Sequence, residues 1–120
     1  MTLEQLVNSK NAIQNLVGEK LPIRVSSDLR KLIKVINPIL VSYEEARIEK
    51  IMEFGECAEG TETWTVKPEN IDAFNTQNKE ALNEELTLNI PIITVGMLER
   101  ADVNLSTSDM VMLEWLIKDE

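Results

Sequence analysis

Histidine is absent from this sequence of 120 residues, and cysteine occurs only once, as Cys57. Without histidine the chain cannot form the Ser-His or Cys-His pairs that most nucleophilic enzymes use. One cysteine can neither close an internal disulfide bond nor, without histidine, supply the ligands of an ordinary zinc site. We therefore predict a protein that is not an enzyme, with no catalytic residues, metal or cofactor, in a reducing cytoplasm.

Long apolar runs are also missing. No stretch approaches the eighteen or so residues of a membrane span, and residues 1–10 lack the order of basic and apolar residues found in secretory signals, so we expect a soluble protein of the cytoplasm. The sequence contains no repeat, low-complexity tract or flexible linker. A hydrophobic content of 43% over 120 residues is enough for one core, and we expect a single domain spanning residues 1–120.

Positive charge is scarce, because 12 basic residues face 21 acidic residues for a formal net charge of −9. A chain of this charge is repelled by the phosphate backbone, so direct binding to nucleic acid is not expected. An acidic balance commonly serves solubility, although a protein that mimics DNA would be acidic as well.

Apolar periodicity predicts a helical N-terminal half. Residues 2–5 have the form of a capping box and open a helix over residues 3–17, which Gly18 ends. Ser26 or Ser27 is then expected to cap a second, long helix that reaches Phe54.

Asn37 and Pro38 interrupt this long helix, so that either Pro38 kinks one continuous helix or Asn37 caps a new one. The period continues across the interruption and favours the kink. Leu32 and Ile36 lie at the centre of the widest apolar stripe, and we predict that both are buried.

The second half of the sequence predicts shorter elements. Residues 61–66 are rich in β-branched and aromatic residues, and residues 86–92 alternate between apolar and polar, so both segments are predicted strands. A third helix opens at residues 67–69, residues 94–100 form a helical turn, and Ser106 caps a last helix. The predicted fold is mostly α with a small β element (α+β): a long kinked central helix packed by shorter helices, plus a two-stranded antiparallel sheet.

Basic residues cluster in one segment. Residues 20–34 hold five basic residues and one acidic residue, whereas the rest of the chain holds seven basic and twenty acidic residues. At the predicted helix start, the hydroxyls of Ser26 and Ser27 and free backbone amides would help to bind a phosphate. The alternative is a solvated helix face whose cations pair with acidic residues from elsewhere. The segment lacks the glycines of a phosphate-binding loop. The residues assigned to anion or partner binding are Arg24, Arg30, Lys31 and Lys34.

Other candidate positions are few. Glu45 and Glu49 share a helix face, but Arg47 and Lys50 interleave with them, which is typical of a solvated face and not of an acid pair or metal site. Tryptophan is enriched at interface hot spots, and Trp64 lies on a short predicted strand beside a loop. We assign Trp64 and Tyr43 as partner contacts.

Two stretches carry a resemblance. Residues 21–37 with Tyr43-Glu44-Glu45-Ala46-Arg47, and the closing residues 113–117, resemble a family of small proteins encoded by tailed phages and prophages of Gram-positive bacteria. Pro38 departs from the family pattern, which has a helix-forming residue there. The resemblance implies no enzymatic activity and no catalytic residues, and it favours proteins that act stoichiometrically through binding surfaces.

Three functions fit this reading. The first is a phage or prophage binding protein that inhibits a host defence factor through protein-protein interaction, on a homo-oligomeric helical scaffold. The second is a sponge that sequesters a phosphorylated small molecule, such as a cyclic nucleotide signal, at the basic cluster. A weaker alternative is a structural or assembly component of the phage particle.

Overall fold

The computed structural model describes residues 1–119 and begins with two short helices, α1 (Leu3–Asn8) and α2 (Lys10–Val17). The predicted capping box is present, because the Thr2 hydroxyl accepts from the Gln5 amide and the Gln5 side chain accepts from the Thr2 amide. The single helix predicted for residues 3–17 is wrong. Ser9 is fully buried, and its hydroxyl donates to the Leu6 carbonyl at 2.9 Å, so the side chain competes with the helical hydrogen bonds and the chain turns there.

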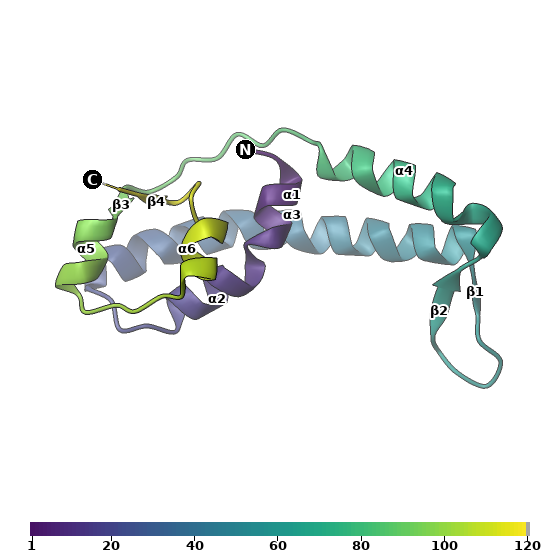
Figure 1. Ribbon diagram of the computed structural model, residues 1–120, viewed down its shortest axis with the longest axis horizontal. Helices are drawn as coiled ribbons and strands as arrows, with labels where there is room; N and C mark the ends of the chain where they lie inside the picture. The colour runs from purple at the N-terminus through teal and green to yellow at the C-terminus, as the bar shows by residue number, and fades with distance from the viewer. Residues whose placement is uncertain (120) are drawn as a thin grey trace.

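The third helix, α3 (Ile23–Phe54), is 32 residues long and runs the length of the molecule (Figure 1). It continues through Pro38, so the favoured prediction of one continuous helix is confirmed and Asn37 does not cap a new one, while the kink at Pro38 stays a prediction. Pro38 has no amide hydrogen and is exposed on the outside of the helix. None of the helices within residues 1–119 has the length and apolarity needed to cross a membrane.

The predicted start of α3 at Ser26 or Ser27 is wrong, because Pro22 occupies the N-cap position and its carbonyl accepts from the Ser26 amide at 3.0 Å. Proline has its φ angle already fixed and can precede a helix at little entropic cost. Both serines therefore lie inside the first turns, with their amides engaged in the helix, and they do not form the anion site expected at a free helix end.

Serine substitutions test this helix start. Ser26→Ala with Ser27→Ala should change the free energy of unfolding by less than about 0.5 kcal/mol, because neither hydroxyl caps the helix. Ser106→Ala removes a real N-cap bond, from the Asp109 amide to the Ser106 hydroxyl at 3.0 Å, and should cost about 0.5 to 2 kcal/mol. Urea unfolding curves of the three proteins provide the measurement. A larger loss in the double variant than in Ser106→Ala would contradict the assignment.

A β-hairpin follows α3, built from β1 (Gly55–Cys57) and β2 (Trp64–Val66) with Cys57 opposite Trp64. The strand predicted at residues 61–66 is therefore confirmed in its last three residues, but its partner is the segment directly after α3 and not residues 86–92. The chain continues through a 3₁₀ turn, η1 (Pro68–Asn70), into α4 (Ile71–Leu82), which packs along the second half of α3 (Figure 1).

Residues 86–92 do not form the predicted strand. The N-terminus holds the beginning of this segment, through backbone bonds from the Leu3 amide to Glu84 and from the Leu86 amide to Met1. Leu86, Leu88 and Ile90 are half-buried against the core while the residues between them are exposed. The alternating pattern therefore reflects one-sided packing on helices and not pairing with a strand.

The C-terminal region consists of short elements. β3 (Ile93–Thr94) pairs in parallel with β4 (Ile117–Lys118). Two helices lie between these strands in the sequence, α5 (Val95–Arg100), capped by Thr94, and α6 (Thr107–Met112), capped by Ser106. The cap at Ser106 was predicted from the sequence. The last helix ends at Met112. Residues 113–116 form a turn that buries Leu113 and Leu116. The fold is mostly α with a small two-stranded antiparallel sheet, as expected.

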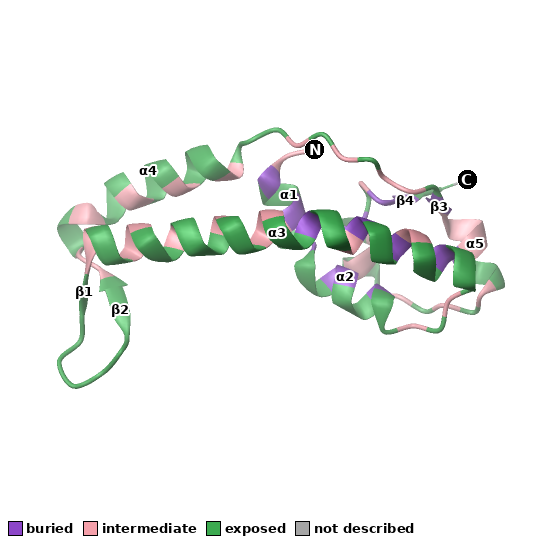
Figure 2. Cartoon of the chain, turned by 180° about the vertical axis from the view of Figure 1, so that it is seen from behind, coloured by how far each residue is buried: buried purple, intermediate pink, exposed green. Residues whose placement is uncertain are grey.

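Burial divides the molecule into two regions. The core lies among α1, α2, the first half of α3 and the C-terminal segments, and Leu32 and Ile36 are buried in it as predicted. We call this region the body. The second half of α3, the hairpin and α4 form an arm, in which no residue is buried (Figure 2). The radius of gyration of 17.7 Å exceeds the roughly 14 Å of a compact chain of this length, so the molecule is elongated.

Candidate binding surfaces

The four assigned cations lie on the first half of α3, and all are exposed. They project from the side of the helix opposite the buried face, which is formed by Val25, Leu29, Leu32 and Ile36. Among residues 1–119 the ion pairs are Met1 with Glu85, Glu44 with Arg47, and Glu53 with Lys50. The alternative in which the four cations pair with acidic residues of the same chain therefore finds no support in the described part of the molecule.

Only two of these cations share a concave surface. Arg30 and Lys34 are four residues apart, and they line a groove of about 260 Å³ between α3 and the end of α2, whereas Arg24 and Lys31 lie outside it. Ser26 also lines the groove. The other lining residues are apolar: Val17, Leu21, Leu29 and Ile33.

The groove continues along α2. A neighbouring pocket of about 190 Å³ shares Val17 and Ile33 with it and adds Lys10, Gln14 and Asn37 to the polar groups. No carboxylate lines either pocket. A chain of net charge −9 thus has an apolar groove edged by three cations, which suits a ligand that is part apolar and part anionic.

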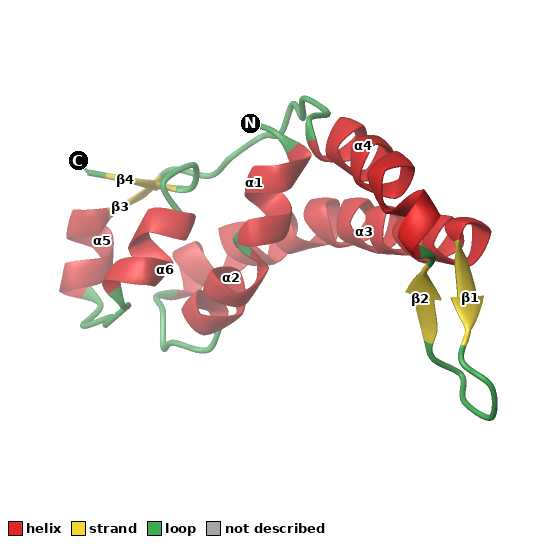
Figure 3. Ribbon diagram, turned by 45° about the vertical axis from the view of Figure 1, so that its right-hand side comes forward, coloured by secondary structure: helices red, strands yellow, loops and turns green. Residues whose placement is uncertain are grey.

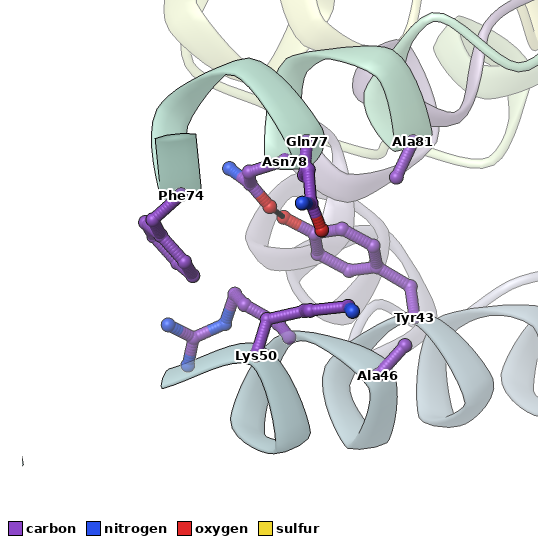
Figure 4. Close-up of a pocket in the computed structure, with 8 residues that line it drawn as sticks. Tyr43, Ala46, Lys50, Phe74, Gln77, Asn78 and Ala81 are labelled. Atoms are coloured by element: carbon purple, nitrogen blue, oxygen red, sulfur yellow. Dashed lines mark hydrogen bonds between the residues drawn. The ribbon is translucent and has the colours of Figure 1, made fainter. Parts of the chain in front are cut away.

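Tyr43 faces the interior of the arm. Its ring points from α3 toward α4, and its hydroxyl donates to the Asn78 side-chain oxygen at 2.7 Å (Figure 4). It lines a pocket of about 130 Å³ with Phe74 and Ala81 on α4 and with Arg47 and Lys50 at the rim. The structure places Tyr43 as a bridge between two helices, on a different surface from the four cations.

The charges at this rim are already paired. Hydrogen bonds from Arg47 hold the pKa of Glu44 below its ordinary value, and the same bonds raise the pKa of Arg47. Lys50 donates to Glu53 at 2.8 Å. Both pairs join residues three apart on α3, so they stabilise the helix and leave little free charge for a ligand.

Trp64 lies on the hairpin that projects from the end of the arm (Figure 3), and it is 38% exposed. The hairpin is strongly acidic: between Lys50 and Lys67 the sequence holds four glutamates and no basic residue. Three of the four, Glu56, Glu59 and Glu62, are exposed on the hairpin itself. An exposed tryptophan among carboxylates, on a projecting element, is the arrangement expected of an anchor for a cationic partner surface.

The sequence analysis did not predict this hairpin, because it placed no strand between the end of the long helix at Phe54 and residue 61. A signal was present in the sequence, because the stretch between Lys50 and Lys67 contains glutamates and no basic residue. This acidic stretch is the counterpart of the basic cluster at the other end of α3. The two charged regions therefore lie at opposite ends of an elongated molecule of 53 × 31 × 25 Å.

Comparison of the chain with protein-family models, curated proteins and solved structures found no match. The resemblance to phage and prophage proteins therefore stays a prediction.

Proposed function

We propose that this chain is a non-enzymatic binding protein of a phage or prophage that inhibits a host defence factor by stoichiometric protein-protein interaction. The projecting hairpin makes the contact, Trp64 is the anchor, and the protein acts in the host cytoplasm on an oligomeric helical scaffold. The observation that carries the proposal is an exposed tryptophan on an acidic element that stands clear of the core.

The charge of the hairpin indicates the kind of partner. Glutamates around Trp64 favour a cationic surface, since opposite potentials accelerate encounter and disfavour other partners. Bacterial proteins that bind nucleic acid or nucleotides have such cationic surfaces. A hairpin that covers such a surface would block access to it without any chemical reaction.

Two hairpin variants test the proposal. Trp64→Ala should weaken partner binding about 30-fold or more, as expected when a hot-spot residue worth 2 kcal/mol or more is truncated. Glu59→Lys with Glu62→Lys should weaken it as well. Both should leave the melting temperature nearly unchanged, because the hairpin contributes nothing to the core. The measurement is quantitative affinity capture from lysates of Gram-positive hosts, followed by titration of the captured protein.

A matched control carries the same change of charge outside the hairpin. Glu80→Lys with Glu84→Lys, in the last turn of α4 and just beyond its end, changes two exposed residues and should retain the partner at wild-type affinity. A partner that binds the hairpin variants as tightly as the wild type would show that the hairpin is not the contact surface.

The second candidate, a sponge for a phosphorylated small molecule, is favoured by the groove that Arg30, Lys34 and Ser26 line. Two cations at its edge would hold a phosphate, and the apolar floor would accept the remainder of the ligand. A nucleotide at one hundred times its Kd should stabilise the protein by about 2.7 kcal/mol. If a panel of mono- and cyclic nucleotides gives no thermal stabilisation, this candidate is wrong.

A further inference from the structure

One face of α3 is free along its whole length. In the first half of the helix this face presents Arg24, Ser27, Lys31 and Lys34, which follow one another at steps of three or four residues. In the second half the same spacing continues through Pro38 to Val41, Glu45, Ile48 and Met52. This alternation of three and four places the residues in one stripe, the spacing of a coiled-coil seam. We call it the α3 seam.

All residues of the α3 seam are exposed. The view from behind (Figure 2) shows α3 crossing the molecule with no other element in front of it. The apolar members are no exception, because Val41, Ile48 and Met52 are 54%, 42% and 48% exposed. Three large apolar side chains in one row on a free helix face indicate a surface that is covered in the working protein.

The charge of the seam changes sign at its middle. Before Pro38 the seam and its flanks hold Arg24, Arg30, Lys31 and Lys34 against one acidic residue, Asp28, and beyond Pro38 they hold Glu45 and Glu49. Within residues 1–119 none of these charged residues forms an ion pair. Arg30 and Lys34 are four apart, as are Glu45 and Glu49, so like charges repel within each half of the isolated helix.

We propose that two copies of this chain associate antiparallel along the α3 seam and form a two-fold symmetric dimer. Only the antiparallel arrangement brings the cationic half of each helix against the anionic half of the other, and it does so twice by symmetry. A parallel arrangement would place like charges opposite one another. The occupant of the free face is therefore a second copy of the same chain.

The crossing point follows from the charges. Lys34 faces Glu45 of the second copy when the helices cross between Pro38 and Val41, while Arg30 and Glu49 lie on the two edges of the same interface. At the crossing the side chains are apolar and uncharged, which allows the helices to approach closely. Ile48 and Met52 then lie over the aliphatic stems of the cations of the second copy, which supply apolar surface below their charged ends. The two hairpins project from opposite ends of the dimer.

Sedimentation equilibrium of charge-reversed variants tests the proposal. The wild-type chain should be a dimer. Arg30→Glu with Lys34→Glu, and separately Glu45→Lys with Glu49→Lys, should each weaken self-association at least about 100-fold, because each variant places like charges at the contact of residue 34 with residue 45 of the second copy. An equimolar mixture of the two variants should form a heterodimer, and the chain that carries all four changes should again form a homodimer.

The direction of pairing has its own measurement. Cys57 is the only cysteine of the chain and is exposed, so it accepts a single spin label. It lies at the base of the hairpin, three residues beyond the end of α3 at Phe54. Phe54 is about fifteen residues beyond the crossing, so at a rise of about 1.5 Å per residue the two helix ends, and the labels beside them, are about 40 Å apart in an antiparallel dimer. Labels within about 20 Å of each other would show a parallel dimer and overturn the proposal.

The proposal is also overturned by a wild-type chain that stays monomeric at high concentration, or by a dimer that withstands both reversals. It deepens the proposed function, since the dimer is the scaffold that presents two hairpins, and the two can fail separately. Glu59→Lys with Glu62→Lys lies outside the seam, so it should lose the host partner and keep the dimer. Dimer loss in this control would place the interface on the hairpin instead.

Discussion

Ile36→Ala is expected to lower the free energy of unfolding by about 2 to 5 kcal/mol, because it removes three carbons from a side chain that is 1% exposed and surrounded by the body core. Leu32→Ala, one turn earlier on the same helix, should have an effect of the same size. With a total stability of about 5 to 15 kcal/mol, the double variant should be largely unfolded or insoluble. Urea titration followed by circular dichroism at 222 nm measures the single variants.

Val35→Ala provides the matched control, since Val35 lies on the same stretch of α3 but is exposed. Its cost should stay within about 0.5 kcal/mol. Equal unfolding midpoints for Ile36→Ala, Leu32→Ala and Val35→Ala would mean that the first half of α3 does not organise the core.

Gly55→Ala is expected to displace the hairpin and to weaken partner binding strongly. A β-carbon at position 55 would collide with the backbone carbonyl oxygens of Ile51 and Thr65, and it would lie 2.9 Å from the Thr65 carbonyl carbon. Backbone atoms cannot rotate away as a side chain can, so β2 or the last turn of α3 must move. We expect a loss of affinity of at least about 30-fold, comparable with that of Trp64→Ala.

The measurement that accompanies Gly55→Ala is an amide correlation spectrum by NMR. Shifts should be confined to the end of α3, the hairpin and the start of α4, while the core residues keep their positions. Gly18→Ala is the control, because its β-carbon would meet only ordinary contacts, at 3.5 Å from Gln14 and 3.6 Å from Asn15. A Gly55→Ala protein with an unperturbed hairpin would contradict the geometry.

The sequence predicted the elements that depend on local chemistry. The period of α3, the caps at Thr2 and Ser106 and the burial of Leu32 and Ile36 all arise from residues within a few positions of one another. Predictions that depend on distant neighbours were less successful. Residues 86–92 do alternate between apolar and polar, but their own sequence does not determine whether the apolar side packs on a strand or on a helix.

The candidate surfaces follow the same division. Clustering of cations at residues 20–34 is visible in the sequence, and so is the lack of basic residues around the hairpin. The groove is not visible, because Val17 and Leu21 reach Arg30 and Lys34 only after the chain turns back at Pro22. Tyr43 could not be placed either, since its hydrogen-bond partner Asn78 lies 35 residues away on α4.

The unequal burial along α3 means that a single helix passes through two regimes of stability. Its first half shares the global free energy of unfolding of the core, whereas its second half depends on its own hydrogen bonds and on one side of α4. Segments with few buried apolar contacts open by local fluctuations that cost much less than global unfolding. The arm can therefore fray and reform while the body stays folded, and the hairpin can reorient on a partner without unfolding the core.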